Sequence, residues 1–395
     1  MKYDFNNSQY AKFWDSRDAA SALRIFLNDP DIIRNRHTFW QRQFSIDPKL
    51  TERQPDGTAV FNTIVRERAV NHMLDMRAPL GQTEPRDKAG LTAYQGTIPD
   101  FAAKGYVETA MEREARERMF EGMFGNDAEI LSAFADDIQL MVDEGNQTMS
   151  NLAAQSLSKG NCSYTFGTGL YGNLYKNPIP EANFVKAGAK VWSDPDAKLI
   201  DQMMKIEQDY RERTGSTLAL KWQIPRADFV TKFLSNNQVK AYIASFRTVN
   251  KLPSVEGMGI TIDMFNEAFR NAELISPIEL VEESQRDGSV GVVHGWASGV
   301  AVLRPVGYAG VIKRAGILDQ TMYQKYGSSV IRKVFATRGL FTIVNSVLNN
   351  GEFKEWHTDL FAAAVPTLDE PLDHIIVDTT QATPSGSGSG SGIGG

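Results

Sequence analysis

The longest regular pattern of apolar and polar positions runs from Phe124 to Asn161, a stretch without proline and with one interior glycine, Gly145. Its apolar side chains recur at steps of three, four or eight residues, and Gly145 occupies the missing place in that stripe. This spacing is the period of an α-helix with one buried face. The members of the stripe are Ile130, Phe134, Ile138, Met141, Met149 and Leu152.

The ends of this helix are also marked in the sequence. Asn126 followed by Glu129 matches an N-terminal capping box, and Lys159-Gly160 predicts the C-terminal end. At about 1.5 Å per residue the helix would be roughly 50 Å long, so we expect it to run along an elongated molecule. Its exposed face is acidic, which on this stretch alone is typical of a solvated helix face.

The pattern upstream of the helix is less regular. Residues 1–68 form a mixed leader whose aromatic residues either bind another surface or pack on the chain's own core. Residues 69–108 predict an extended loop, in which the strand-like segments VNHMLDM and LTAYQGTI enclose an exposed tip rich in Pro, Gly and charge. A polar hairpin of this length is usually functional or disordered. The aromatic residues of the leader are Tyr10, Phe13, Trp14, Phe39 and Trp40.

Downstream of the long helix, helical and strand-like periods alternate. SDPDAKLIDQMMKIEQDYRERTG predicts a helix capped by Asp194, with Pro195 at its first position and a stripe of Leu199, Met203, Ile206 and Tyr210. TLALKWQI predicts a strand with Leu218, Leu220, Trp222 and Ile224 on one face. RADFVTKFLSN predicts a further helix, ISPIELVEES and VAVLRP further strands, and the final PSGSGSGSGIGG a flexible tail.

Composition narrows the class of protein. A chain of 395 residues with 42% hydrophobic residues can bury a core, and its length favours two or three domains. A net charge of -6 excludes a dedicated polyanion binder. The single cysteine, Cys162, excludes an intramolecular disulfide framework and suits a reducing compartment. No apolar run approaches a membrane span, and the first residues lack the apolar core of a signal peptide.

No catalytic, cofactor or metal signature stands out. GTGLYG matches the dinucleotide pattern, but the prolines of the following NLYKNPIP forbid the helix that the pattern needs, so tight turns between two short strands are the better account. Cys162 is expected to be a small core residue. These absences leave open a site assembled from distant residues. The histidines, which show no ligand spacing, are His37, His72, His294, His357 and His374.

The order of these parts resembles that of the major capsid proteins of tailed bacteriophages, which have the α+β Hong Kong 97-type capsid fold. The resemblance extends over about residues 60–380. The segments that carry it are the long helix itself, RDKAGLTAYQGTIPDFAAKGYVETA, LALKWQIPRADFVTKFLSNN, GVAVLRPVGYAGVI and PTLDEPLDHIIVDT.

The resemblance implies a division of the chain. We expect an N-terminal arm (1–68) and an extended loop that lies over a neighbouring subunit (69–108). A peripheral domain (109–192) with the long helix as its spine (about 126–160) follows, and then an axial domain (193–345). The chain would then return to the peripheral domain (346–380) and end in a flexible tail (381–395).

The resemblance also implies a function. The chain would be a structural protein, not an enzyme and without a cofactor, that self-assembles through hexamers and pentamers into the icosahedral head of a virion, formed in the cytoplasm of the host bacterium. Its implied partners are further copies, a scaffolding protein, a portal, decoration proteins in some members, and packaged double-stranded DNA by nonspecific proximity. Some members cross-link Lys to Asn, and Lys88 lies in the loop, although nothing in the sequence singles it out.

Two groups of charged residues are the expected contact sites. The loop tip would make assembly contacts through Glu84, Arg86, Asp87 and Lys88. The acidic face of the spine would face the lumen and repel DNA phosphates, since electrostatics dominates nonspecific binding. Its members would be Asp136, Asp137, Asp143 and Glu144.

Two alternatives stay open. One is an encapsulin-type compartment shell, which has the same fold but holds a protein cargo. The other is a soluble α/β enzyme whose site is built from distant residues. Particle size and nucleic-acid content distinguish the shells from each other, and a monodisperse small oligomer would indicate the enzyme.

Overall fold

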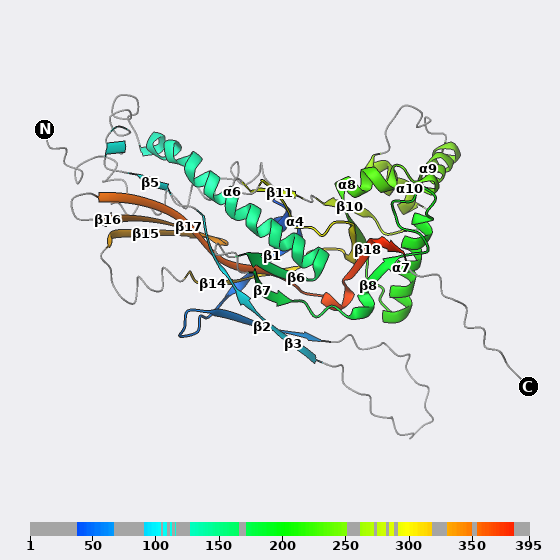
Figure 1. Cartoon of the computed structure of the whole chain (residues 1–395), viewed down its shortest axis with the longest axis horizontal. Helices are drawn as coiled ribbons and strands as arrows, with labels where there is room; N and C mark the ends of the chain where they lie inside the picture. The colour runs from blue at the N-terminus through cyan, green and yellow to red at the C-terminus, as the bar shows by residue number, and fades with distance from the viewer. Residues whose placement is uncertain are drawn as a thin grey trace, which may run out of the picture. The chain divides into compact units, whose positions relative to one another are not determined.

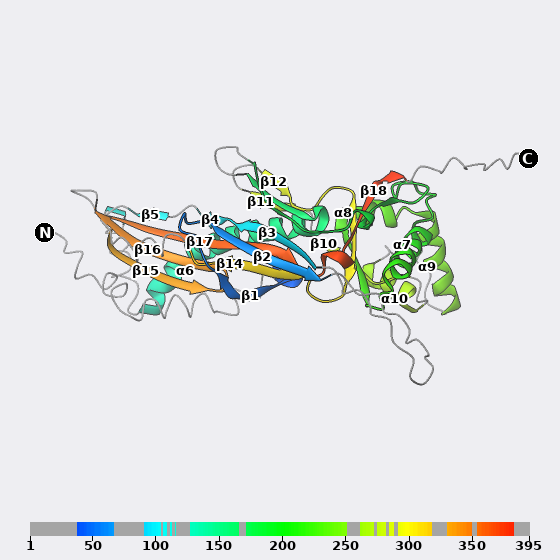
Figure 2. The ribbon, with the colours of Figure 1, turned by 90° about the horizontal axis from the view of Figure 1, so that it is seen from below.

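The computed structural model describes residues 38–66, 91–103, 106–108, 111–112, 115, 127–165, 171–250, 261–271, 275–281, 284–287, 291–317, 330–349 and 354–382. The chain divides into two compact units (Figures 1 and 2). The first holds the described residues up to Phe61 together with those of Gln95–Ala153 and Gly310–Thr367. The second holds those of Asn62–Tyr94, of Ala154–Ala309 and from Leu368 onward.

The predicted long helix is present as α6, Asp127–Lys159, with 33 residues. Its predicted apolar stripe is confirmed where side chains are described, because Met141, Met149 and Leu152 are each only 1% exposed. A Cβ added at Gly145 would overlap Cε1 of Phe341 and lie 3.0 Å from its Cζ. The ring of Phe341 therefore fills the place that the missing side chain leaves in the stripe.

The first unit is built on a mixed seven-stranded sheet, to one face of which α6 packs (Figures 1 and 2). Its main path has the order β1-β14-β17-β16-β15, and β4 and β5 also pair with β17. The strands are β1 Phe44–Thr51, β4 Asp100–Ala102, β5 Tyr106–Glu108, β14 Gly310–Ala315, β15 Val330–Arg338, β16 Phe341–Asn349 and β17 Lys354–Leu368. β1 runs parallel to β14, and β16 and β17 form a long antiparallel pair.

A short helix, α4 (Phe39–Gln43), precedes β1 and is tied to α6. The indole Nε1 of Trp40 donates a hydrogen bond of 3.0 Å to Oδ1 of Asn146. Phe39 and Trp40 are both buried, so these two leader aromatics pack on the chain's own core. Tyr10, Phe13 and Trp14 lie outside the described residues.

In three places the observed strand pairing crosses the predicted boundaries of the segments. β1 falls within the predicted leader, 1–68, but pairs with β14. β4 and β5 fall within the predicted loop, 69–108, but pair with β17. Strands β14, β15 and β16 fall within the predicted middle domain, 193–345, and instead form the sheet of the first unit. These pairings join strands far apart in sequence, and local patterns carry no information about such partners.

Three pairs of strands form separate two-stranded sheets. The pair that follows α6 confirms the two short strands predicted in NCSYTFGTGLYGNLYKNP. The pairs are β2 Ala59–Arg66 with β3 Leu91–Ile98, β6 Asn161–Thr165 with β7 Tyr171–Lys176, and β11 Ser284–Asp287 with β12 Gly291–His294.

The second unit contains a five-stranded sheet of order β10-β9-β13-β18-β8. β9 is parallel to β10 and antiparallel to β13, which is antiparallel to β18, and β18 is parallel to β8. Alternate residues point to opposite faces of each strand. The strands are β8 Phe184–Ala187, β9 Leu220–Pro225, β10 Ile278–Val281, β13 Val300–Pro305 and β18 Ile375–Ala382.

Helices cover one face of this sheet, and Figure 2 shows α7, α9 and α10 grouped beside it. Their buried side chains form one core with those of β9, β13 and β18. The predicted α7 stripe is confirmed, since Leu199, Met203, Ile206 and Tyr210 all belong to this core, and so do Leu220, Trp222 and Ile224 of β9. The helical segments are η1 Glu181–Asn183, α7 Leu199–Thr214, α8 Arg226–Asp228, the π-helical turn η2 Phe229–Phe233, α9 Asn237–Val249, α10 Ile262–Asn271 and η3 Pro371–Asp373.

The predicted start of α7 is wrong. The helix begins at Leu199 and not at Pro195, because Asp194 caps a preceding turn by accepting a hydrogen bond of 2.8 Å from the backbone N of Asp196. The N-terminal amide of Ile200 is satisfied from another helix, by Oε1 of Gln238 at 2.9 Å. A partner this distant along the chain gives no capping signal in the local sequence.

Candidate functional site

The predicted loop-tip residues, Glu84, Arg86, Asp87 and Lys88, lie outside the described residues. Their segment joins β2 to β3, which pair with each other. The predicted flank LTAYQGTI coincides with β3. On the other side the described strand is β2, upstream of the predicted VNHMLDM, which itself lies outside the described residues. The assembly role of the loop tip therefore stays a prediction.

The four acidic residues predicted to face the lumen all lie on α6. Asp136 and Asp143, like Asp137 and Glu144, are seven positions apart, so each pair falls close to one line along the helix. Glu144 is exposed and Asp143 is partly exposed, whereas the side chains of Asp136 and Asp137 are outside the description. The helix thus carries two adjacent acidic rows, and what they face remains a prediction.

In the second unit the last turn of α6 is held by buried polar groups. Nε2 of His374 makes a hydrogen bond of 2.7 Å with the carbonyl oxygen of Leu157. Oγ of Ser158 accepts a hydrogen bond of 2.8 Å from the backbone N of Ala297 and donates one of 2.8 Å to the carbonyl of Ala154. Burial lowers the pKa of His374 to about 4, so its imidazole is neutral at physiological pH.

Cys162 lies in a buried polar group beside the same end of α6. Its Sγ is 3.5 Å from the hydroxyl of Tyr175, and that hydroxyl is 3.0 Å from Oγ of Ser156. Burial raises the pKa of the thiol to about 12, so it is protonated and unreactive at neutral pH. The prediction of a core cysteine is confirmed.

The GTGLYG motif belongs to the hairpin of β6 and β7. Gly172 lies within β7, opposite Tyr164, and a strand follows the motif where a nucleotide site would need the start of a helix. Gly167 and Gly169 lie outside the described residues. The structure therefore agrees with rejecting a dinucleotide site here.

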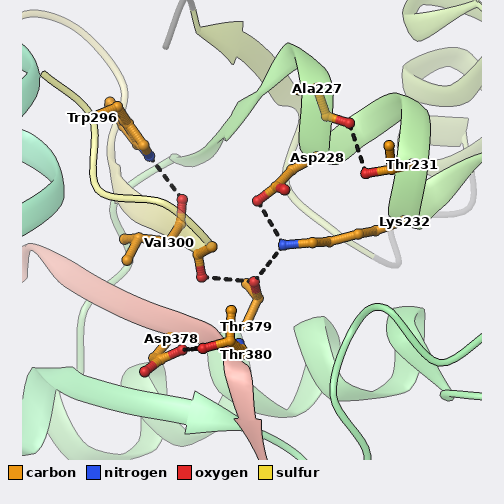
Figure 3. Close-up of polar contacts among 10 residues, drawn as sticks. Ala227, Asp228, Thr231, Lys232, Trp296, Val300, Asp378, Thr379 and Thr380 are labelled. Atoms are coloured by element: carbon orange, nitrogen blue, oxygen red, sulfur yellow. Dashed lines mark hydrogen bonds and ion pairs between the residues drawn. The ribbon is translucent and has the colours of Figure 1, made fainter. Parts of the chain in front are cut away.

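A polar cluster joins the π-helical turn η2 to the end of β18 (Figure 3). The ammonium group of Lys232 lies 2.7 Å from Oδ2 of Asp228 and donates a 2.9 Å hydrogen bond to Oγ1 of Thr379. Thr379 Oγ1 in turn donates a 2.7 Å hydrogen bond to the carbonyl of Gly299. A π-helical turn often marks a functional position. Here the lysine is engaged by its own helical segment and by β18, so the cluster fastens one element to another.

Two buried charged residues were missed by the sequence reasoning. Glu207 of α7 accepts hydrogen bonds from Nε1 of Trp222 at 2.6 Å and from the backbone N of Ser276 at 2.8 Å. Arg304 of β13 donates to Oε1 of Gln223 at 3.1 Å and to two backbone carbonyls of the following loop. The available signal was an arginine within the otherwise apolar strand VAVLRP. Glu207 had no comparable signal, because acidic residues are common on helix surfaces.

These ionisable groups hold elements together and are spread through the second unit. Within the described residues no three His, Cys, Asp or Glu side chains gather as a metal site would require. No helix of the described part of the chain combines the length and apolar character needed to cross a membrane.

The fold as a whole is that of the Hong Kong 97-type capsid proteins. No protein-family model and no curated protein matches the sequence. Among solved structures, the chain is similar to a protein of an E. coli CFT073 prophage that is assigned as its capsid protein, with a TM-score of 0.50 and 12% identity over 91% of this chain and 98% of that one. At this identity the similarity establishes the fold.

Two further solved structures are similar at lower scores. A phage-related protein of Bordetella bronchiseptica RB50 has a TM-score of 0.44 and 12% identity, covering 89% of this chain and 97% of that one. A chain of the mature capsid of bacteriophage PhiM1 has a TM-score of 0.41 and 12% identity, covering 88% of each chain. The fold assignment rests on the prophage protein alone.

Proposed function

We propose that this chain is the major capsid protein of a tailed bacteriophage, whose copies assemble through hexamers and pentamers into an icosahedral shell around packaged DNA. The observation that carries the proposal is the similarity to the prophage protein, which extends over 91% of this chain and 98% of that one. Because nearly the whole of both chains takes part, the proposed role belongs to the fold as a whole and not to one pocket.

The proposed division of labour follows the segments of the chain. The residues before α4 act as an arm that clasps neighbouring subunits, and the segment between β2 and β3 lies over a neighbour, with Glu84, Arg86, Asp87 and Lys88 in the contact. The first unit, with the seven-stranded sheet that includes β14, β15 and β16, forms the peripheral domain, and the second unit, with the five-stranded sheet, forms the axial domain around five- and sixfold positions. A closed shell needs several modest contacts from each identical chain, and arms and hairpins supply them.

The proposal extends to the surroundings of the shell. The role is structural and not enzymatic, the assembled protein resides in the virion, and assembly takes place in the host cytoplasm. A scaffolding protein and a portal take part in assembly. Packaged double-stranded DNA lies near the acidic rows of α6 without specific contacts, since like charge disfavours close approach to phosphate.

The test is electron microscopy and sedimentation velocity of the purified full chain. We expect closed particles, or hexamers and pentamers that close when a scaffolding protein is supplied. A monodisperse small oligomer at all concentrations would contradict the proposal and favour a soluble enzyme. Closed particles that capture a protein cargo and no nucleic acid would favour the compartment shell instead.

A further inference from the structure

The turn between β13 and β14, residues 306–309, presents two large apolar side chains to solvent. Val306 is 56% exposed and Tyr308 is 63% exposed. No charged residue occurs from Pro305 to Ile312, although 23% of the whole chain is charged. We call this segment the 306–309 loop.

The 306–309 loop is held in one shape by the residues beneath it. Nη1 of Arg304 donates to the carbonyls of Pro305 at 2.8 Å and Gly307 at 3.0 Å. The backbone N of Val306 donates to the carbonyl of Ala219 at 2.9 Å. Gly307 has a φ of 111°, which an L side chain rarely adopts, so glycine is required at that position.

Burying the charged side chain of Arg304, which supports the loop, costs free energy. Arg304 is only 1% exposed, and desolvation lowers its pKa to about 10, which still leaves it charged at neutral pH. Taking an ion out of water destabilises a fold unless its hydrogen bonds are made well. Here two of those bonds go to the carbonyls of Pro305 and Gly307, so the buried arginine helps to fix the shape of the loop.

We propose that the 306–309 loop is a contact between one copy of this chain and a second copy, with Arg304 as its positioning residue. This inference rests on the proposed function as a shell protein. Tyrosine, here on a loop whose backbone is held by hydrogen bonds, is one of the residue types that contribute most to protein interfaces. Preorganisation by Arg304 reduces the entropy lost when the contact forms.

The net charge of the chain favours a second copy as the partner that binds the 306–309 loop. The chain carries a net charge of -6, so two copies repel each other except where their contacting surfaces are uncharged, as this loop is. Nucleic acid would require basic residues, which the loop lacks. Exposed Asp369 and Glu370 lie beside the loop, since the N of Asp369 donates to the carbonyl of Ala309 at 3.1 Å, so their charges mark the edge of the uncharged surface.

The small area of the 306–309 loop also favours a second copy as its partner. Two side chains offer far less than the roughly 800 Å² per partner of a stable two-protein interface. A contact this small contributes only when several act together, as in a closed assembly of identical chains.

The experiment uses thiol labelling of the full chain carrying Val306→Cys. The native cysteine, Cys162, is fully buried and does not compete for the reagent. The labelling rate is measured on dilute, unassembled protein and on concentrated, assembled protein. We expect assembly to slow labelling at position 306 by about tenfold or more, because a hot-spot contact excludes water.

A second variant tests whether the contact drives association. Val306→Ser with Tyr308→Ser is expected to raise the concentration needed for half-assembly by about tenfold or more. Val230→Ser is the matched control, since Val230 is 53% exposed in the same unit but lies in η2. It should assemble like the wild type, and all three chains should have the same circular dichroism when unassembled.

The outcomes separate this inference from the proposed function. Closed particles with unchanged labelling and unchanged assembly of the double variant would overturn the inference and leave the proposed function standing. Small oligomers with a protected position 306 would support the inference and overturn the proposed function. A chain that stays monomeric at every concentration would overturn both.

Discussion

Buried ionisable residues in the second unit are each matched to a specific backbone or side-chain partner. Glu207 accepts two hydrogen bonds from Ser276, at 2.8 Å each, and a third from the indole of Trp222. His374 is matched to a single carbonyl, that of Leu157. A hydrogen bond to a charged acceptor contributes about 1.5–3 kcal/mol, and losing one partner leaves the other buried and unsatisfied. The positions of α7 and of the end of α6 are therefore fixed by polar contacts as well as by apolar burial.

His374 makes the stability of the second unit depend on pH. Its pKa is lowered to about 4 by burial, with the nearby Arg304 acting in the same direction, against 6.5 for a free histidine. Below pH 6.5 the unfolded chain binds a proton that the folded chain does not, so stability falls as pH falls from 6.5 to about 4. At about 1.4 kcal/mol per pH unit, this one residue would cost about 3 kcal/mol across that window.

The comparison is between the wild type and His374→Gln, whose amide can still donate to the carbonyl of Leu157. Urea unfolding of unassembled protein at pH values from about 4 to about 7 should show a shallower loss of stability in the variant. Carboxylates that titrate in this window are common to both chains and cancel in the difference. Parallel stability curves would show that His374 titrates normally in the folded protein.

At the scale of elements, the contact between α6 and β16 explains an unfavourable residue in a long helix. Glycine costs about 1 kcal/mol relative to alanine in a helix interior. Gly145→Ala should nevertheless destabilise the protein by about 1–3 kcal/mol, because the new methyl group would overlap the ring of Phe341 in a packed interior. Denaturant unfolding of the unassembled chain measures the change.

Phe341→Leu supplies the matched partner for a double-mutant cycle. Removing the ring frees the space beside position 145, so Gly145→Ala should become neutral or stabilising in the Phe341→Leu background. The expected coupling is about 1 kcal/mol or more, as for residues in direct contact. Additive effects of the two substitutions would show that the ring moves aside without cost. Contact with Phe341 would then not explain the glycine at position 145.

The helices could be predicted from sequence to the extent that their burial is periodic. The stripe of α6 and that of α7 are visible because a helix repeats one face every few residues, and Gly145 stands out as a gap in the stripe. The ring that fills the gap could not be identified, since Phe341 lies nearly 200 residues further along the chain. The start of α7 is misplaced for the same reason, because Gln238 and not Asp194 satisfies an amide of its first turn.

Strands were less predictable than helices. β3, β6, β7, β9, β10 and β13 are recognisable as strands, but the sheet to which each belongs is not. The parallel pairing of β1 with β14 joins residues more than 250 positions apart, as Phe44 opposite Gly310 shows. Pairing partners depend on tertiary packing, and local alternation identifies only a strand with one buried face. Of the candidate site, the sequence could supply the acidic rows of α6 but not Arg304 under the 306–309 loop, because its loop partners are backbone carbonyls.

At the scale of the whole molecule, the proposed shell gives the acidic rows of α6 a function. A shell that packs DNA at high density must keep its inner surface from binding phosphate, because each neutralised phosphate releases counterions and stabilises the complex. Two adjacent acidic rows along one helix would provide such a surface in every subunit. The proposal that Asp136 and Asp137 face the lumen can be tested by reversing their charge.

Asp136→Lys with Asp137→Lys raises the charge at each position by two and changes the net charge of the chain from -6 to -2. Empty shells of this variant, mixed with DNA fragments small enough to enter, should retain them at low salt and release them as ionic strength rises. The control is Asp209→Lys with Glu212→Lys, the same change of charge at two exposed positions of α7. Retention is measured by sedimenting the shells and assaying the DNA that travels with them.

If the α6 variant retains no more DNA than the wild type at low salt, or no more than the α7 control, the acidic rows do not line the lumen. The location of α6 on the inner side of the shell would then have to be abandoned.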